Sequence, residues 1–164
     1  MIKYGFKIYL FNKLFLKPKI VSKFTGILIF INVNYPPKMK DYKKYFTIDA
    51  PPEDVYNALT NEATIQLWSG EEAVMPLEPG AEFSLWDGSI TGKNIEFVPG
   101  KKIVQEWYFG GQDEPSIVTI ILHAAKSGTS AELRHTNIPD ADFNNITEGW
   151  NDNYFGSRSD FYDE

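Results

Sequence analysis

The sequence lacks cysteine, and it also lacks any long hydrophobic run. Among its 164 residues there is no Cys, which excludes disulfides, thiolate metal sites, Cys nucleophiles and iron–sulfur clusters. The longest unbroken apolar run, Gly26 to Ile31, is far shorter than the roughly 20 residues of a membrane-spanning helix. A chain of this length can bury enough surface to form one domain without cross-links. These features favour a soluble globular protein and argue against a membrane partner.

Acidic residues are absent from the first 40 residues, which carry eight Lys. Residues 41–164 carry eight basic and twenty-two acidic residues, and their net charge is therefore −14. Because an acidic body repels phosphate backbones, we expect no nucleic-acid partner. The contrast in charge indicates that the two parts should be interpreted separately.

Residues 1–38 form a basic extension in which twenty-eight residues are Ile, Lys, Phe, Asn, Tyr or Leu. AT-rich codons specify these residue types, and Met39 is an internal start, so we expect the extension to be disordered or not translated. A targeting or membrane-binding arm and a structural extension are the alternatives. The segment has neither the cleavage site of a secretory signal nor the Arg content of a transit peptide, which favours a cytoplasmic location.

Regular structural signals begin at Met39. Alternation over 43–49 predicts a strand, and Pro51-Pro52-Glu53-Asp54 predicts the start of a helix. A second short helix is expected to end at Ser69-Gly70. Turn residues such as Asp87-Gly88 then separate several short strands, which indicates an antiparallel sheet. The strands are expected at 81–86, 89–98, 103–109, 116–123 and 129–136.

The last segment changes to helical spacing. Asn145 and Glu148 resemble a capping box at the start of a long helix. An apolar stripe follows along one face of this helix, formed by Ile146, Trp150, Tyr154 and Phe161. A curved sheet with a long helix lying across it would bury this stripe.

A dense set of motifs carries a family resemblance. It includes Gly88-x-Ile90-x-Gly92-x-Asn94-x-Glu96-x-Val98-Pro99-Gly100-Lys101-Lys102-Ile103-Val104-Gln105-x-Trp107, then Arg134-His135-Thr136-Asn137-Ile138-Pro139 and Gly149-Trp150. Over about residues 41–164 the chain resembles the activator of heat shock protein 90 ATPase homologue family. The resemblance implies the α+β helix-grip fold of the SRPBCC (START and Bet v 1-like) superfamily for residues 39–164. That fold has a curved antiparallel sheet of about six to seven strands, two short helices and one long C-terminal helix.

The resemblance also carries functional expectations. Members of the superfamily can enclose an apolar cavity between the long helix and the sheet, and they bind lipids, hormones or polyketides. Eukaryotic co-chaperones of the family carry such a domain beside a separate amino-terminal domain. Residues 1–38 are too short for that second domain and lack its Asn- and Trp-rich motif, which argues against ATPase stimulation. The resemblance therefore implies the fold more firmly than the function.

Aromatic side chains are the feature of the sequence that bears most on function. They fall on the short helix, the sheet and the long helix, so some must face inward. Aromatic walls are typical of small-molecule sites, but the same rings can also fill a core. The candidate cavity residues are Trp68, Phe83, Trp86, Phe97, Trp107, Phe109, Trp150 and Tyr154.

The sequence shows no catalytic or metal-binding pattern. At roughly 3.3 Å per residue, His123 and His135 would lie more than about 10 Å apart along a hairpin, too far to share a zinc ion. There is no nucleophile-elbow motif. Most paired carboxylates fall in expected turns, although Glu96 and Glu106 lie within strands and could point inward. We therefore expect no catalytic residue, metal or cofactor.

Three functional hypotheses follow from these observations. The leading one is a non-enzymatic protein that binds an apolar or amphipathic small molecule between the long helix and the sheet. The alternative is a co-chaperone-like interaction module, with a chaperone as partner and an acidic surface facing a basic one. A cyclase- or hydrolase-type enzyme is the least favoured.

Overall fold

The computed structural model describes residues 38–109 and 114–156 in full. It also describes the backbone of two antiparallel paired strands, β1 (Lys19–Phe24) and β2 (Ile27–Ile31). Most of the N-terminal extension lies outside the described residues. The expectation that residues 1–38 are disordered or not translated therefore stays a prediction.

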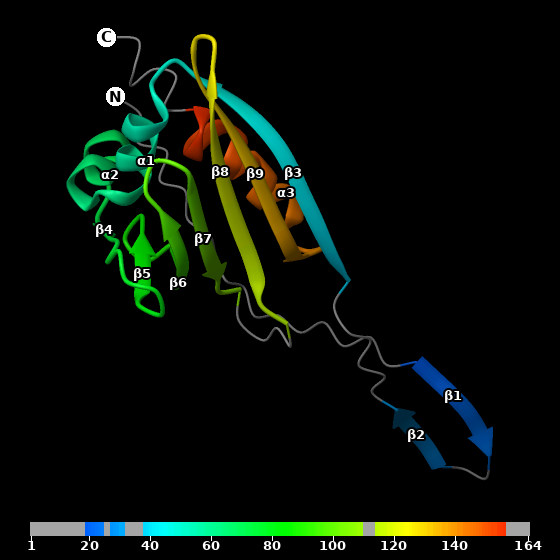
Figure 1. The fold of residues 1–164 in the computed structure, drawn as a ribbon. Helices are drawn as coiled ribbons and strands as arrows, with labels where there is room; N and C mark the ends of the chain where they lie inside the picture. The colour runs from blue at the N-terminus through cyan, green and yellow to red at the C-terminus, as the bar shows by residue number, and fades with distance from the viewer. Residues whose placement is uncertain (1–18, 25–26, 32–37, 110–113, 157–164) are drawn as a thin grey trace.

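A seven-stranded antiparallel sheet forms the body of the protein, with the strand order β3-β9-β8-β7-β6-β5-β4 (Figure 1). This arrangement confirms the expected α+β fold with a curved antiparallel sheet. The sequence analysis did not predict the short edge strand β4. The strands are β3 (Met39–Ile48), β4 (Ala73–Val74), β5 (Glu82–Leu85), β6 (Ile90–Val98), β7 (Lys102–Trp107), β8 (Ser116–Ala125) and β9 (Gly128–Pro139).

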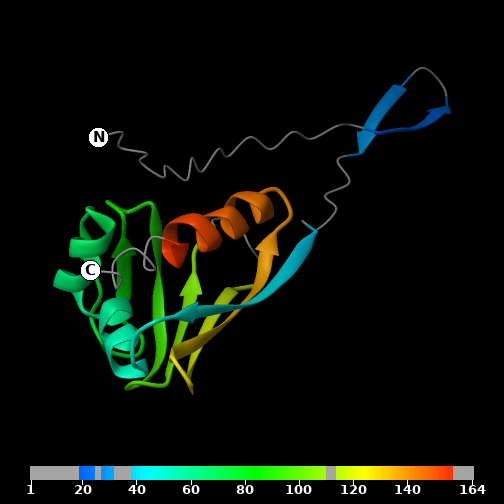
Figure 2. The same ribbon diagram turned by 90° about the horizontal axis from the view of Figure 1, so that it is seen from above.

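Alternation along the strands separates an inner face from an outer face. On β8 the residues Ser116, Val118, Ile120 and Leu122 are buried, while those between them are only half-buried. Side chains of successive strand residues point to opposite sides, so these four belong to the inner face. The described helices lie on the inner side of the sheet, and none of them covers the outer face (Figure 2).

Two short helices follow β3, as the sequence predicts, and lead into β4. Helix α1 (Pro52–Thr60) has Pro near its start and acidic residues in its first turn, which suit the positive end of the helix dipole. Helix α2 (Glu62–Ser69) begins where the Asn61 side chain accepts a hydrogen bond from the Thr64 amide at 3.0 Å. It ends at Gly70, whose φ of 72° is the left-handed conformation that glycine adopts without strain.

The C-terminal helical segment lies across the inner face. It consists of α3 (Phe143–Glu148) and a continuing π-helix, η1 (Gly149–Tyr154). The predicted capping box at Asn145 and Glu148 is wrong. The helix begins at Phe143, after a turn in which the Asp142 amide bonds to the Pro139 carbonyl at 2.9 Å, so Asn145 already lies inside it.

The apolar stripe of this segment is confirmed for Ile146, Trp150 and Tyr154, which are all buried. The fourth expected member, Phe161, lies outside the described residues. The segment is also held to the edge strand β3. The Asn151 side-chain oxygen accepts hydrogen bonds from Lys44 and, at 3.2 Å, from the Tyr42 hydroxyl.

The hairpin between β5 and β6 turns at Asp87-Gly88, as the sequence predicts. Both residues have positive φ, and the Ser89 amide bonds to the Trp86 carbonyl at 2.9 Å, which is the geometry of a type I′ turn. Trp86 also has a left-handed φ of 51°, a conformation that costs a non-glycine residue roughly 1–2 kcal/mol. This strained backbone positions the Trp86 indole against the inner cluster described next.

Candidate functional site

Five of the eight predicted cavity residues come together on the inner side of the sheet. Trp107 stacks on Trp150 at 4.8 Å between ring centroids, and Trp150 meets Tyr154 at 4.5 Å. Tyr154 in turn lies 5.7 Å from Trp86 and 5.9 Å from Trp68. We call these five side chains the aromatic cluster. They come from α2, the β5–β6 turn, β7 and η1.

The other three candidates lie outside this cluster. Phe83 packs on the sheet over Gly92, where an added Cβ would lie 2.6 Å from the Phe83 ring. Phe97 pairs with Ile103 across β6 and β7 and is only partly buried. Phe109 is buried and lies 6.0 Å from the His135 ring. These three residues belong to the packed core or its border.

Little space is left inside the aromatic cluster. The gap that it lines has a volume of about 10 Å³, and a neighbouring gap beside Ile90 and Trp107 has about 20 Å³. Such volumes suit about one water molecule, whereas small-molecule pockets typically have about 300–1,000 Å³. A small molecule bound between these rings would require them to move apart, and small-molecule binding stays a prediction.

His135 links the aromatic cluster to the sheet through a chain of hydrogen bonds. The Trp150 indole N–H donates to His135 Nδ1 at 3.0 Å, and this contact places the imidazole proton on Nε2. Nε2 then donates to Ser116 Oγ at 2.9 Å, and the Ser116 hydroxyl donates to the Thr136 carbonyl at 3.0 Å. Both nitrogens of His135, the Trp150 indole N–H and the Ser116 hydroxyl therefore each have a hydrogen-bond partner.

This Ser–His pair is arranged for structure rather than for nucleophilic catalysis. A general base would need an unprotonated nitrogen facing Ser116, but the nitrogen that faces it carries the proton. His135 is fully buried, and burial lowers its pKa to about 3, so the ring is neutral near pH 7. The sequence analysis considered His135 only as a metal ligand and did not predict this role.

The strand carboxylates that could have pointed inward face outward instead. Glu96 contacts Lys102 at 2.7 Å, and Glu106 lies 3.8 Å from Lys93. The buried polar pair on the inner face of β6 and β7 is neutral. Gln105 donates to the Asn94 side-chain oxygen at 2.8 Å, and Asn94 donates to the Pro76 carbonyl at 2.7 Å.

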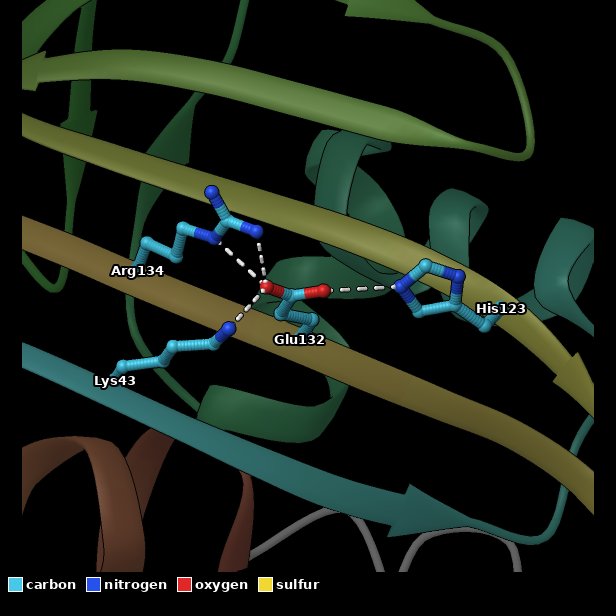
Figure 3. Close-up of polar contacts among 4 residues, drawn as sticks. All are labelled: Lys43, His123, Glu132 and Arg134. Carbon is cyan, nitrogen blue, oxygen red and sulfur yellow. Dashed lines mark hydrogen bonds and ion pairs between the residues drawn. The ribbon is translucent and has the colours of Figure 1, made fainter.

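The outer face carries a compact charged cluster, drawn in Figure 3. Glu132 accepts a hydrogen bond from Lys43 at 2.9 Å and two from Arg134 at 2.6 and 2.7 Å, and it lies 3.2 Å from His123 Nε2. We call these four residues the outer-face cluster. Its side chains come from β3, β8 and β9.

Glu132 is only 5% exposed even though it lies on a face without a helix, because its neighbours' side chains lie over it. Hydrogen bonds from Lys43 first, and then from Arg134, lower the pKa of Glu132 to about 2. The same contact raises the pKa of Lys43. The carboxylate is therefore ionised at any pH at which the protein is normally handled.

Alternation along the strand correctly predicts that Glu132 and His135 face opposite sides of the sheet. The partners of Glu132 were missed, because Lys43 is far away in sequence and becomes its neighbour only through the register of β3 against β9. His123 and His135 also lie on opposite faces, in agreement with the expectation that they cannot share a metal ion. Within the described ranges, no group of three or more His, Asp or Glu side chains could hold a metal ion.

The chain can now be placed among known proteins. Residues 49–156 match the family described as Activator of Hsp90 ATPase homolog 1-like protein. The chain belongs to this family, which lies in the SRPBCC superfamily. The family suggested by the Gly88–Trp107 motifs is thereby confirmed.

Curated relatives match different fractions of this chain and only part of their own length. The activator of 90 kDa heat shock protein ATPase homolog of Dictyostelium discoideum is 32% identical over 83% of this chain and 36% of its own length. Homolog 1 of Homo sapiens is 28% identical over 63% of this chain and 31% of its own length. The chain thus spans about a third of the length of these curated relatives.

Solved structures share the fold over most of the domain. An HSP90 activator from Plasmodium falciparum is 30% identical, with a TM-score of 0.66 over 73% of this chain and 92% of that one. A Mesorhizobium loti protein, at 20% identity, has a TM-score of 0.64 over 76% of this chain and 97% of that one, which shows the fold alone. Among the described residues, no helix combines the length and apolar character needed to cross a membrane.

Proposed function

We propose that this chain is a chaperone-binding module of the activator type, and that its partner is an Hsp90-type chaperone. The observation that carries the proposal is the family match over residues 49–156. The Dictyostelium relative, named as an activator homolog of the 90 kDa heat shock protein ATPase, supports it over 83% of the chain. The Plasmodium HSP90 activator supports it through a shared fold.

The packing of the interior supports binding through the surface. The aromatic cluster leaves room for about one water molecule, and the buried His135 has its hydrogen-bonding atoms satisfied. These side chains therefore stabilise the fold and hold the C-terminal helix on the sheet. A domain whose interior is occupied by its own side chains can still present a fixed outer surface to a partner.

The proposal concerns binding by a non-enzymatic domain. The Ser116–His135 pair supports this assignment, because its proton sits on the nitrogen that faces the serine. The curated relatives are named as homologs of an activator of the 90 kDa heat shock protein ATPase, and the chain spans about a third of their length. We expect the chain to bind the chaperone.

Binding of the full chain to the Hsp90-type chaperone of its own organism tests the proposal. We would label the chain with a fluorophore at its N-terminus, titrate it with the chaperone at low ionic strength, and measure fluorescence anisotropy. Saturable binding, together with competition by unlabelled chain, is expected. An unrelated acidic domain of similar net charge is the matched control. The proposal is wrong if the chain and this control bind equally well, or if neither binds.

A further inference from the structure

The outer-face cluster holds more positive charge than its single carboxylate can neutralise. Lys43 and Arg134 lie directly opposite each other in the register of β3 and β9, and like charges placed in this way destabilise a sheet. Glu132 supplies one negative charge against these two cations. The cluster therefore keeps one net positive charge even when His123 is neutral. Stability alone does not account for this arrangement.

The two cations are fixed and also accessible. Glu132 uses one N–H of Lys43 and two of Arg134, whereas the two side chains offer three and five N–H donors respectively. The side chains of Lys43 and Arg134 are 50% and 52% exposed. Because Glu132 holds both cations in place, a partner would lose little side-chain entropy on binding them.

The cluster is positive within an acidic body. Residues 49–87, which form α1, α2, β4 and β5, contain nine acidic residues and no Lys or Arg. The outer surface of β3, β8 and β9 has no helix over it (Figure 2). Beside Lys43, the Tyr45 ring is 54% exposed, and its centroid lies 5.2 Å from Lys43 Nζ. An incoming chain thus meets a small basic and aromatic patch on β3 and β9 and an acidic region at residues 49–87.

We propose that the outer-face cluster is the docking surface for an acidic segment of the partner protein, with Lys43 and Arg134 binding its carboxylates. Charge complementarity identifies the occupant, because carboxylates fit the remaining N–H donors of Arg134 and Lys43. The acidic residues at 49–87 would repel the same acidic segment, which disfavours its binding to that side of the domain. This inference rests on the proposed function for the identity of the partner, the chaperone, but not for the chemistry of the site.

The test compares variants that remove equal charge from the same face. We would measure the affinity of the full chain for the chaperone in wild type, in the double variant Lys43→Met/Arg134→Met and in the control double variant Lys93→Met/Lys102→Met. Lys102 lies on β7 and contacts Glu96. Lys93 lies on the outer face of β6 and contacts Glu106, three strands away from β9. The double variant is expected to bind at least about tenfold more weakly, and the control to bind within about twofold of wild type. Circular dichroism verifies that each variant is folded.

A second measurement makes the result independent of the chaperone. An acidic peptide rich in Glu and Asp is added to the ¹⁵N-labelled full chain at low salt. The expected chemical-shift changes concentrate at β3, β8 and β9, and they disappear in the single variant Arg134→Met, which retains Lys43 as a partner for Glu132. Single-stranded DNA is the comparison ligand, and we expect weaker shifts with it because of the acidic body.

The possible outcomes separate the two proposals. If the chaperone binds and the double variant binds equally well, the docking surface is wrong while the proposed function stands. If the chaperone does not bind but the peptide perturbs the cluster, the proposed function is wrong while the docking surface stands. Peptide shifts located elsewhere, no peptide shifts, or stronger shifts with DNA overturn the inference directly.

Discussion

Strand β9 carries two buried titratable side chains on opposite faces of the sheet, and their surroundings differ completely. His135, on the inner face, is fully buried among aromatic rings and is neutral, because burial lowers its pKa to about 3. Glu132, on the outer face, is 5% exposed and charged, because Lys43 and Arg134 lower its pKa to about 2. Three positions along one strand thus separate a neutral site from an ionic one.

The difference shows that the two faces of the sheet have different roles. The inner face uses neutral hydrogen bonds among rings, since a buried charge without an ionic partner would be costly there. The outer face surrounds one carboxylate with cations that stay half exposed and can meet a partner. The inner face therefore stabilises the fold, while the outer face is available for binding.

Disruption of the inner face should have the largest effect. Replacing Trp150 by Ala removes a fully buried ring that stacks on Trp107 and bonds to His135. We expect a loss of about 3–5 kcal/mol in the free energy of unfolding, measured by urea titration. Trp150→Phe keeps most of the ring but leaves His135 Nδ1 without a donor, and should cost about 1–3 kcal/mol. Equal losses for the two variants would contradict the role assigned to the hydrogen bond.

The pH dependence of stability separates the inner face from the outer face. Between about pH 6.5 and about 3, the unfolded chain protonates His135 while the folded chain does not. Its contribution is therefore complete above pH 6.5 and is lost as the pH falls, by about 1.4 kcal/mol per unit. Glu132 acts in a lower window, because its contribution is complete above pH 4.5 and is lost as the pH falls toward about 2.

His135→Gln provides the measurement for the inner-face contribution. A Gln side chain can accept from Trp150 and donate to Ser116, but it does not titrate. Subtracting the urea-unfolding profile of the variant from that of wild type over pH 4.5 to 6.5 should isolate the His135 slope. Parallel profiles for the two proteins would show that His135 titrates equally in the folded and unfolded states.

The smallest expected effect on stability comes from the outer face. Glu132→Gln leaves Lys43 and Arg134 opposite each other without a counter-charge. We expect a modest destabilisation that added salt partly reverses, because salt screens exposed like charges. The measurement is the midpoint of thermal unfolding at about 0.02 M and about 0.5 M NaCl. A variant that salt does not stabilise relative to wild type would contradict the ionic origin of the cluster.

Most of the fold could be predicted from local sequence patterns. The Asp87-Gly88 turn, the alternation in the strands and the Ser69-Gly70 helix end each depend on residues that are close in the chain. The start of the last helix was misplaced. Asn145 and Glu148 have capping-box spacing, but the helix already begins two residues earlier, at Phe143, directly after a turn. The π-helix at Gly149–Tyr154 has no sequence signal that we could identify.

The sites were harder to predict because they depend on contacts between distant strands. Helical spacing correctly indicated that Trp150 and Tyr154 are buried, but it could not show that they pack against Trp107 and against each other. The outer-face cluster requires the register of β3 against β9, which composition does not reveal. Net charge also concealed it, because a body of net charge −14 gives no sign of a local basic patch.

Native mass spectrometry of the full chain, purified gently from its own host and mixed with the Hsp90-type chaperone, tests the central claim most directly. A single spectrum reports both a protein complex and any bound small molecule. We predict a chain–chaperone complex in which the released chain has its unmodified mass. A chain that forms no complex and carries a reproducible small-molecule adduct, lost on denaturation, would contradict the claim that this domain works through its outer face.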